Sequence, residues 1–399
     1  MNREQMLGRL RTAEAAWDII VIGGGATGLG IAVDAASRGH RVALLERGDF
    51  AEGTSSRSTK LIHGGVRYLQ QGRLGLVREA LRERGRLLRN APHLVRPLPF
   101  IVPVYRWWEQ PWYGLGLGLY DLLAGASGFG PSFQVDRSRV VADLPNIAQG
   151  GLRGGVRYLD GQFDDAALAL ALARLAEEQG AVLLNYCPVV GLRKEAGRIC
   201  GVDAIDQESG ETLTLAARVV INATGPFSDA VRRLDAPQAT PLIAPSQGVH
   251  LVLPGRFLGG DSALLVPRTP DGRVIFLIPW HGRVLVGTTD TPVSEVSAEP
   301  RPKAAEIEFL LSTANRYLAQ TAGVGDILSV FAGIRPLIGD GSASSAGRSR
   351  EHWLQADPAS GLITVAGGKW TTYRQMAEDS VDLAEHSGQL ITRSCRTAS

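Results

Sequence analysis

The sequence has few cysteines, few lysines and no long apolar run. Its three cysteines, Cys187, Cys200 and Cys395, form no CxxC pair and no metal-ligand spacing. This indicates buried or incidental thiols in a reducing compartment rather than a disulfide relay or a zinc site. No stretch approaches the roughly 18 consecutive apolar residues that a transmembrane helix needs. The polar, charged N-terminus does not resemble a signal peptide. We therefore expect a cytoplasmic protein, or one attached peripherally to the inner face of the cytoplasmic membrane.

The charge of the chain is nearly balanced. There are 42 lysines and arginines against 40 aspartates and glutamates, for a formal net charge of +2. Because no basic run resembles a binding tail, nucleic acid is not an expected partner. The length of 399 residues is sufficient for two domains that share one large core.

The stretch that begins at Trp17 has the pattern of a nucleotide-binding βαβ unit. A buried strand is expected over 19–22, a helix over 26–38 and a second strand over 41–46. Glu46 ends the second strand, where a carboxylate can accept the ribose hydroxyls of a dinucleotide.

The turn between the first strand and the helix contains the GxGxxG motif at Gly23, Gly25 and Gly28. In this motif the first glycine allows a tight turn and the second lets the backbone approach a pyrophosphate. The third lets the helix pack close to the strand. Free N–H groups at the start of the helix then bind the pyrophosphate.

The loop after this unit favours FAD over NAD. Residues 54–59 read TSSRST and are followed by KLIHGG at 60–65. Small residues let the backbone pass close to a flat ring, and N–H groups stabilise negative charge on a reduced flavin. The apolar spacing of Val66, Leu69 and Leu74 argues against a flexible surface loop. No second GxGxxG follows a strand, so no nicotinamide partner is expected.

Together, GGGATG and TSSRSTKLIHGGVRYL resemble the FAD-dependent glycerol-3-phosphate dehydrogenases, a branch of the flavoprotein group that includes D-amino-acid oxidase and glycine oxidase. The resemblance runs from about Trp17 to about Met376. The family normally continues into a C-terminal helical domain, which this chain, ending at Ser399, is expected to lack. Further matching motifs are NATG at 222–225, QGVH at 247–250, VGTTD at 286–290, GIRPL at 333–337 and GGKWTTYR at 367–374.

The resemblance implies an α/β fold with a Rossmann-like FAD-binding domain and a second α+β substrate domain. Strands at 248–253, 263–266, 274–278 and 284–288, separated by turns, predict the antiparallel sheet on which the substrate domain is built. We assign residues 17–91, 150–235 and 325–399 to a discontinuous FAD-binding domain. We assign 92–149 and 236–324 to the substrate domain.

The motifs and the βαβ unit together imply the contacts with FAD. NATG resembles the second FAD fingerprint, and Val189 follows a strand-turn that meets the adenine in this flavoprotein group. The expected cofactor-binding residues are Gly23, Gly25, Ala26, Thr27, Gly28, Glu46, Thr54, Ser55, Ser56, Ser58, Lys60, Leu61, Val189, Ala223, Thr224, Gly225, Gly333, Gly368, Lys369, Trp370 and Thr371.

The reaction implied by the resemblance moves a hydride from C2 of sn-glycerol 3-phosphate to N5 of FAD and gives dihydroxyacetone phosphate. A dianionic phosphate needs cations, and the planar guanidinium group suits it. Arg67 in HGGVRY and Arg335 in GIRPL are therefore the expected phosphate ligands, with Lys369 and Tyr68 nearby.

A base must accept the proton of the substrate hydroxyl, and imidazole suits neutral pH. His63 and His250 both lie in matching motifs. The sequence does not assign which of them binds and which abstracts the proton. The expected catalytic residues are thus His63, His250 and Arg335.

The electrons are expected to pass to a quinone, but the sequence leaves the acceptor open. One alternative is an FAD-dependent oxidase that uses O2 with glycerol 3-phosphate or an amino acid. The pair Arg67 and Arg335 favours a phosphate over a carboxylate. A second alternative is an FAD-binding protein without activity, against which the intact HGGVRY, GIRPL and GGK motifs argue.

Two segments are candidates for peripheral membrane contact. The segment from Trp107 to Tyr120 is rich in Trp and Tyr, which favour the membrane interface. The helix expected over 73–96 carries an apolar stripe and many arginines. A core contact, a homodimer contact or a solvated amphipathic helix are the alternatives. Further along, Asp164 or Asp165 is placed to cap a helix over 166–179.

Overall fold

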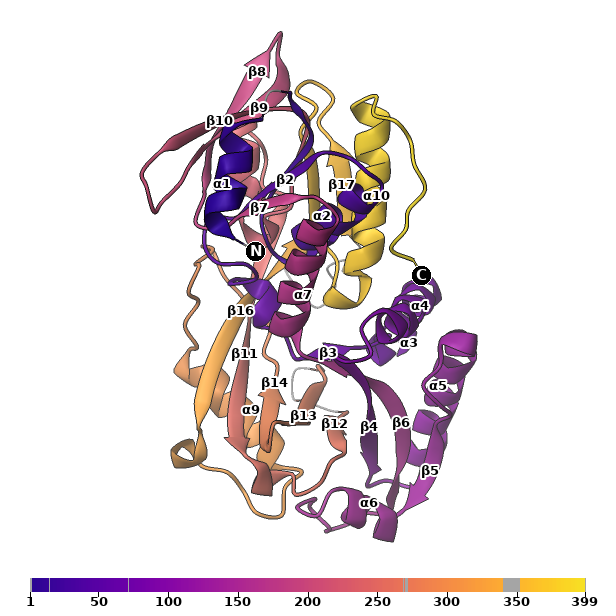
Figure 1. The fold of residues 1–399 in the computed structure, drawn as a ribbon. Coiled ribbons are helices and arrows are strands. Elements are labelled where there is room, and N and C mark those ends of the chain that lie inside the picture. The colour runs from indigo at the N-terminus through magenta and orange to yellow at the C-terminus, as the bar shows by residue number, and fades with distance from the viewer. Residues whose placement is uncertain are drawn as a thin grey trace.

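The computed structural model describes residues 2–13, 15–70, 72–267, 269, 272–339 and 352–398, and of Arg67 and Gln70 only the backbone. Two halves, each built on one sheet, lie one above the other (Figure 1). The N-terminus lies in the upper half, and the C-terminus lies beside the point where the halves meet. The α/β fold class is confirmed.

The upper half contains a mostly parallel sheet, as the βαβ unit predicts. Its strand order is β17-β18-β10-β1-β2-β7, with β17 antiparallel to β18 and the others parallel. Strands β8 and β9 form a hairpin, and β9 of this hairpin pairs with β10. The strands are β1 (Trp17–Ile22), β2 (Val42–Leu45), β7 (Val182–Leu184), β8 (Val189–Glu195), β9 (Arg198–Ile205), β10 (Thr212–Asn222), β17 (His352–Ala356) and β18 (Ile363–Gly367).

Both faces of this sheet are covered, which explains why β1 is apolar from Ile19 to Ile22. Ile19 and Val21 are fully buried on the face covered by α2 (Ala26–Ser37), α7 (Asp165–Glu178) and α10 (Tyr373–Ser387). Ile20 and Ile22 point to the other face, where α1 (Arg3–Arg11) packs. A strand buried on both faces reads as a continuous apolar run.

The cap of α7 is confirmed, because Asp164 Oδ1 accepts a hydrogen bond from the Ala167 N–H at 3.0 Å.

The lower half contains the second sheet, which is mainly antiparallel as expected. Its order is β15-β11-β14-β13-β12-β4-β6-β3, with β16 paired to β11 and β5 paired to β6. The pair β4–β12 is parallel. The strands are β3 (Leu61–Ile62), β4 (Val95–Val104), β5 (Phe133–Asp136), β6 (Gly154–Phe163), β11 (Ile243–Pro254), β12 (Ala263–Val266), β13 (Ile275–Trp280), β14 (Arg283–Gly287), β15 (Thr291–Pro292) and β16 (Ser329–Ile338).

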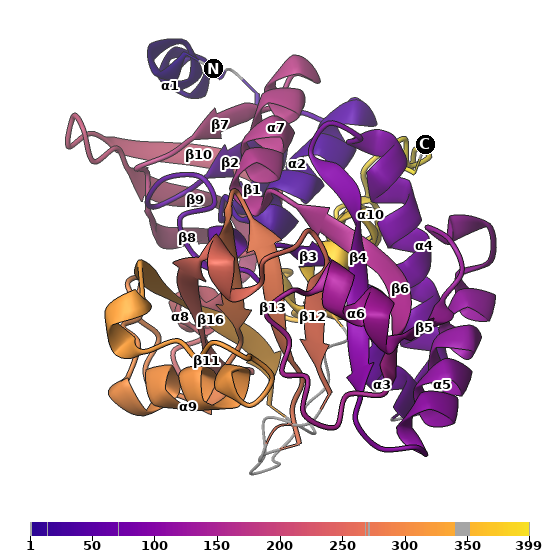
Figure 2. The ribbon, with the colours of Figure 1, turned by 90° about the horizontal axis from the view of Figure 1, so that it is seen from below.

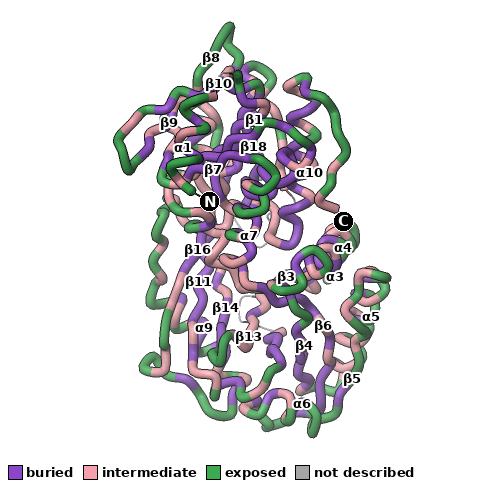
Figure 3. Tube along the Cα trace, viewed as in Figure 1, coloured by how far each residue is buried: buried purple, intermediate pink, exposed green. Residues whose placement is uncertain are grey.

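Helices flank the second sheet on its two sides. α9 (Ala304–Asn315) lies alongside β11 and β16, and α5 (Glu109–Ala124) lies at the opposite side of this half (Figure 2). The other helices are α3 (Val66–Gln70), α4 (Leu74–Asn90), α6 (Arg137–Asp143) and α8 (Ser228–Asp235). Figure 3 shows buried residues concentrated in the central strands and exposed ones on α5 and the outer loops. Within the described ranges, no helix is both long and apolar enough to cross a bilayer.

One expectation about this half needs correction, and one stays a prediction. The helix expected over 73–96 ends at Asn90, and the chain enters β4 at Val95. The expected helix was too long because its apolar stripe did not reveal the strand that follows Pro92. Strands β6 and β16 pair within the second sheet, although their residues fall in ranges assigned to the FAD-binding domain. The domain boundaries themselves stay a prediction.

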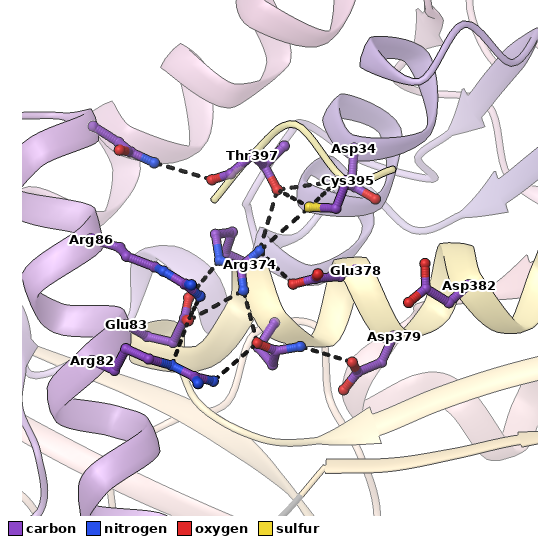
Figure 4. Close-up of polar contacts among 12 residues, drawn as sticks. Asp34, Arg82, Glu83, Arg86, Arg374, Glu378, Asp379, Asp382, Cys395 and Thr397 are labelled. Carbon is purple, nitrogen blue, oxygen red and sulfur yellow. Dashed lines mark hydrogen bonds and ion pairs between the residues drawn. The ribbon is translucent and has the colours of Figure 1, made fainter. Parts of the chain in front are cut away.

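The two halves are joined by a buried network of charged groups centred on Arg374 (Figure 4). Arg374 of α10 donates to both carboxylate oxygens of Glu83 on α4, at 2.6 and 3.2 Å, and to Glu378 at 2.7 Å. The C-terminal tail crosses this junction, where Cys395 Sγ lies 3.1 Å from Asp34 Oδ1 on α2. The arginine of the GGKWTTYR motif is therefore structural. Cys395, like Cys187 and Cys200, is a free thiol, as expected.

Candidate active site

A cavity of about 450 Å³ lies at the carboxyl ends of the parallel strands of the upper sheet. Its lining includes Gly23 after β1, Glu46 after β2, Thr224 after β10 and Gly368 after β18. Open α/β sheets bind their ligands at this edge. The cavity therefore coincides with the dinucleotide site that the sequence predicts.

The glycine turn fits a bound pyrophosphate. Gly23 has φ of +110°, and a Cβ on it would lie 2.7 Å from the carbonyl oxygen of Ala223. A Cβ on Gly28 would lie 1.9 Å from the carbonyl oxygen of Gly23, so only glycine lets α2 pack this closely. Gly25 lines the cavity and caps α2, which points the positive end of the helix dipole at the ligand.

Glu46 lies where a ribose contact is expected, and its carboxylate is held by the backbone. Oε2 accepts the Gly24 N–H at 2.6 Å and Oε1 accepts the Gly48 N–H at 2.9 Å. Next to it, the guanidinium of Arg47 lies 3.6 Å from the centre of the Phe227 ring, and both residues line the cavity. This stacked pair was missed, because nothing local in the sequence relates residues so far apart in the chain.

Most of the expected cofactor residues line this cavity. These are Gly23, Gly25, Ala26, Thr27, Glu46, Thr54, Ser55, Val189, Ala223, Thr224, Gly225, Gly368, Lys369 and Trp370. Trp370 is held in place by a hydrogen bond from its Nε1 to the Ser55 carbonyl at 2.8 Å. The remaining expected residues lie elsewhere in the described structure: Gly28, Ser56, Ser58, Lys60, Leu61, Gly333 and Thr371.

Several of these remaining residues instead fix the loop that follows the βαβ unit. Lys60 forms an ion pair with the buried Asp165, which also accepts hydrogen bonds from the N–H and the hydroxyl of Ser58, at 3.1 and 2.6 Å. Asp165 thus fixes the loop after the βαβ unit, a role that the capping interpretation did not include. The Thr371 hydroxyl lies 3.3 Å from the backbone nitrogen of His63.

A second cavity, of about 800 Å³, lies on the other side of β16. Arg335 lines this second cavity, whereas its neighbours Ile334 and Pro336 line the cofactor cavity. Successive side chains of a strand point to opposite faces. β16 is therefore a wall shared by the two cavities, and a substrate beside Arg335 lies next to the cofactor site.

Cationic groups gather where the two cavities adjoin. Arg335 Nη2 donates to Thr288 Oγ1 at 3.0 Å, and Nη1 lies 3.4 Å from Asp290 Oδ1. Lys369 Nζ lies 4.0 Å from the centre of the Tyr68 ring, so these two predicted neighbours are adjacent. Arg67 is on α3 beside Tyr68, but its side chain lies outside the described part of the structure. Arg73 and Arg273 also line the cavity and were not selected from the sequence.

The two candidate histidines have different surroundings. His63 lines the second cavity. His250 is 2 % exposed, stacks on Phe331 with ring centres 4.8 Å apart, and is not among the described residues that line that cavity. Its Nε2 lies 2.9 Å from Thr59 Oγ1. Burial, together with the charges of Arg335 and Lys60, lowers the pKa of His250 to about 3. These surroundings favour His63 for proton transfer, and the assignment stays a prediction.

The depressed pKa of His250 predicts a pH-dependent loss of stability. The unfolded chain binds a proton at this side chain below its ordinary pKa of about 6.5. The folded protein does not bind it until the pH approaches about 3. The free energy of unfolding should therefore fall as the pH drops through this window. Between pH 6.5 and 5 the contribution is on the order of 2 kcal/mol.

Urea titrations of the wild type and His250→Asn over this pH range measure that contribution. The asparagine variant should lack it, so its stability relative to the wild type should improve as the pH falls. A difference between the two proteins that does not change with pH would contradict the neutral, buried state of His250.

Comparison with known proteins identifies the family. The sequence profile of the FAD dependent oxidoreductase family matches residues 18–374. Mitochondrial glycerol-3-phosphate dehydrogenase from Homo sapiens is 46% identical over 100% of this chain and 57% of its own length. The Saccharomyces cerevisiae protein of the same name is 41% identical, and this chain covers 68% of it. The chain thus spans little more than half the length of the mammalian relatives.

A solved structure agrees with the sequence relatives. Glycerol-3-phosphate dehydrogenase from Bacillus halodurans complexed with FAD has a TM-score of 0.80 and 33% identity to this chain, covering 99% of this chain and 69% of that one. The expected family and its FAD cofactor are thereby confirmed. The chain belongs to the FAD-dependent oxidoreductase family, in its glycerol-3-phosphate dehydrogenase branch.

Proposed function

We propose that this chain oxidises sn-glycerol 3-phosphate to dihydroxyacetone phosphate and passes the electrons to a quinone. The observation that carries the proposal is β16, which points Arg335 into one cavity while its two neighbours line the cofactor cavity. The relatives named glycerol-3-phosphate dehydrogenase support the choice of substrate.

Arg335 and Lys369 are suited to hold the phosphate. Thr288 and Asp290 orient the Arg335 guanidinium, which leaves a planar, permanently charged group at the cavity wall. Charge-assisted hydrogen bonds to a dianion are stronger than neutral ones, so they fix the orientation of the substrate. We assign Arg67 the same role from its motif.

His63 is the group that we propose accepts the hydroxyl proton of the substrate. Its ring lies on the cavity wall, 6.5 Å from the Phe276 ring between centres, and neutral imidazole is matched to this task near neutral pH. FAD, when bound, supplies the acceptor for the two electrons of the C2 hydride. Apolar walls such as Phe100 and Phe276 exclude water from the site.

The same cavity supports a quinone as the acceptor. Its volume of about 800 Å³ exceeds what a three-carbon phosphate fills, and its lining includes the apolar side chains of Val66, Leu69, Trp112, Leu115 and Leu119. An apolar lining of this kind suits a flat, apolar molecule better than a second polar substrate.

Turnover with a short-chain quinone under nitrogen, compared with turnover in air, tests the acceptor. We expect dihydroxyacetone phosphate and one reduced quinone per substrate, with little hydrogen peroxide in air. Stoichiometric peroxide at an equal or greater rate would instead assign the O2-dependent oxidase.

The exposed side of α5, from which Trp112 and Leu115 also line the second cavity, is our proposed site of peripheral contact with the membrane. Trp112, Leu115 and Leu122 are 61%, 76% and 77% exposed, and Trp107 just before the helix is 75% exposed. Tyr120, included in this segment from the sequence, is 1% exposed and lies on the inner face, so it is not part of the contact. Trp and Leu on one side of a helix suit insertion at the lipid interface.

Replacing both Leu115 and Leu122 with serine should weaken binding to phosphatidylglycerol-containing vesicles about tenfold, because apolar side chains supply the insertion energy. Flotation assays measure it. A matched control replaces Leu170 and Leu175, two exposed leucines of α7. Equal binding by both double variants would contradict the assignment. Loss of a dimer instead of loss of vesicle binding would assign the face to a second copy of the chain.

A further inference from the structure

The turn that carries His63 is hydrogen-bonded to a buried polar side chain. This turn, His63 to Gly65, joins β3 to α3, and its middle residue Gly64 is buried. The Gly64 N–H donates to the hydroxyl oxygen of Tyr120 at 2.7 Å. A Cβ on Gly64 would lie 2.6 Å from that oxygen, so the contact requires glycine here.

Tyr120 is in turn oriented by a buried ion pair. Its hydroxyl donates to Asp160 Oδ2 on β6 at 2.9 Å. The other carboxylate oxygen of Asp160 accepts from Arg84 Nη1 on α4 at 2.7 Å. Asp160 and Arg84 are 2% and 1% exposed. Three elements, α4, α5 and β6, therefore converge on one backbone amide.

The direction of these hydrogen bonds is fixed. Burial raises the pKa of Asp160, and the Arg84 guanidinium opposes that rise. An ionised carboxylate can only accept, and the Tyr120 hydroxyl donates to it. Burial keeps the pKa of Tyr120 well above its usual value, so the phenol stays protonated. The hydroxyl oxygen of Tyr120 then accepts the hydrogen bond from the Gly64 N–H through a lone pair. Arg84 Nε has no hydrogen-bond partner among the described residues, but the Tyr120 hydroxyl and both carboxylate oxygens of Asp160 are paired. Buried hydrogen bonds in series hold their members in a single arrangement.

We propose that Tyr120 is a positioning residue whose hydroxyl holds the Gly64 amide and thereby fixes the turn that carries His63. This inference rests on the proposed function, in which His63 accepts the substrate proton. Catalytic groups lose much of their effect when they are displaced by about an ångström. None of Tyr120, Asp160 and Arg84 lines the cofactor cavity, whereas Asp160 also lines the second cavity. The contact that reaches the turn is the hydrogen bond from the Gly64 N–H to Tyr120.

The test compares Tyr120→Phe with Tyr105→Phe. Both substitutions remove one hydrogen-bonded tyrosine hydroxyl: Tyr105 donates to the Ala148 carbonyl at 2.8 Å, and Tyr120 bonds both Gly64 and Asp160. Two quantities are measured on the FAD-loaded proteins: deuterium exchange of the backbone amides in a peptide spanning residues 61–66, and steady-state turnover of glycerol 3-phosphate.

In Tyr120→Phe we expect exchange of that peptide to rise about tenfold, since one hydrogen bond to a buried amide is lost. We expect kcat to fall about tenfold with KM within about twofold, because the turn and not the phosphate site is loosened. Tyr105→Phe should change neither quantity.

Unchanged exchange over residues 61–66 in Tyr120→Phe would overturn the inference, and so would faster exchange with wild-type kcat. A wild-type protein that does not turn over glycerol 3-phosphate would overturn the proposed function instead. In that case the exchange measurement still decides whether Tyr120 holds the turn.

Discussion

Replacing Arg335 with alanine should lower kcat/KM for glycerol 3-phosphate about a hundredfold, or about 3 kcal/mol, mostly through KM. The guanidinium lines the substrate cavity and is oriented by Thr288 and Asp290. Its removal takes away a charge-assisted contact with the dianionic phosphate. FAD content should not change, because Ile334 and Pro336 supply the side of β16 that faces the cofactor cavity.

Two further variants separate this effect from a general loss of charge. Arg335→Lys keeps the charge without the planar two-point contact and should recover only part of the loss. Arg256→Ala removes an exposed arginine paired with Asp326 far from the site and should leave kinetics unchanged. A wild-type KM in Arg335→Ala would remove this residue from the phosphate site.

Replacing His63 with asparagine should slow flavin reduction by about 10²–10⁴-fold, the usual contribution of a positioned general base. The reason is its place on the cavity wall, whereas His250 is buried with a pKa lowered to about 3. Stopped-flow absorbance under nitrogen measures the reductive step alone, so that the acceptor does not affect the result.

The same stopped-flow measurement on His250→Asn decides which of the two histidines is the base. We expect a smaller effect there, and none in His281→Asn, where the histidine lies in an exposed turn. Wild-type reduction by His63→Asn together with a large loss in His250→Asn would transfer the role of base to His250.

The residues that could be predicted from the sequence are those whose function depends on neighbours in the chain. The glycine turn, Glu46 and the NATG segment each follow a strand, and parallel strands bring their carboxyl ends to one edge. For this reason the cofactor cavity matches most of its predicted lining. The motif residues Arg335 and Tyr68 line one cavity, and Lys369 contacts Tyr68.

What could not be predicted depends on the register of distant elements. Lys60 pairs with Asp165, and Arg47 stacks on Phe227, because the loop after the βαβ unit packs against α7 and the end of β10. The aromatic segment that contains Tyr120 left membrane, dimer and core contacts open, since a single sequence does not show which face of α5 turns inward. The start of β4 could not be predicted, because the strand contains three prolines and proline is unusual within a strand.

The most direct test of the account is the visible spectrum of the purified, FAD-loaded protein before and after anaerobic addition of glycerol 3-phosphate. We predict that the flavin bands bleach with this substrate and stay unchanged with glycine or D-alanine. A flavin that remains oxidised with glycerol 3-phosphate, or that is reduced by either amino acid, would contradict the proposed substrate while leaving the FAD-binding fold intact.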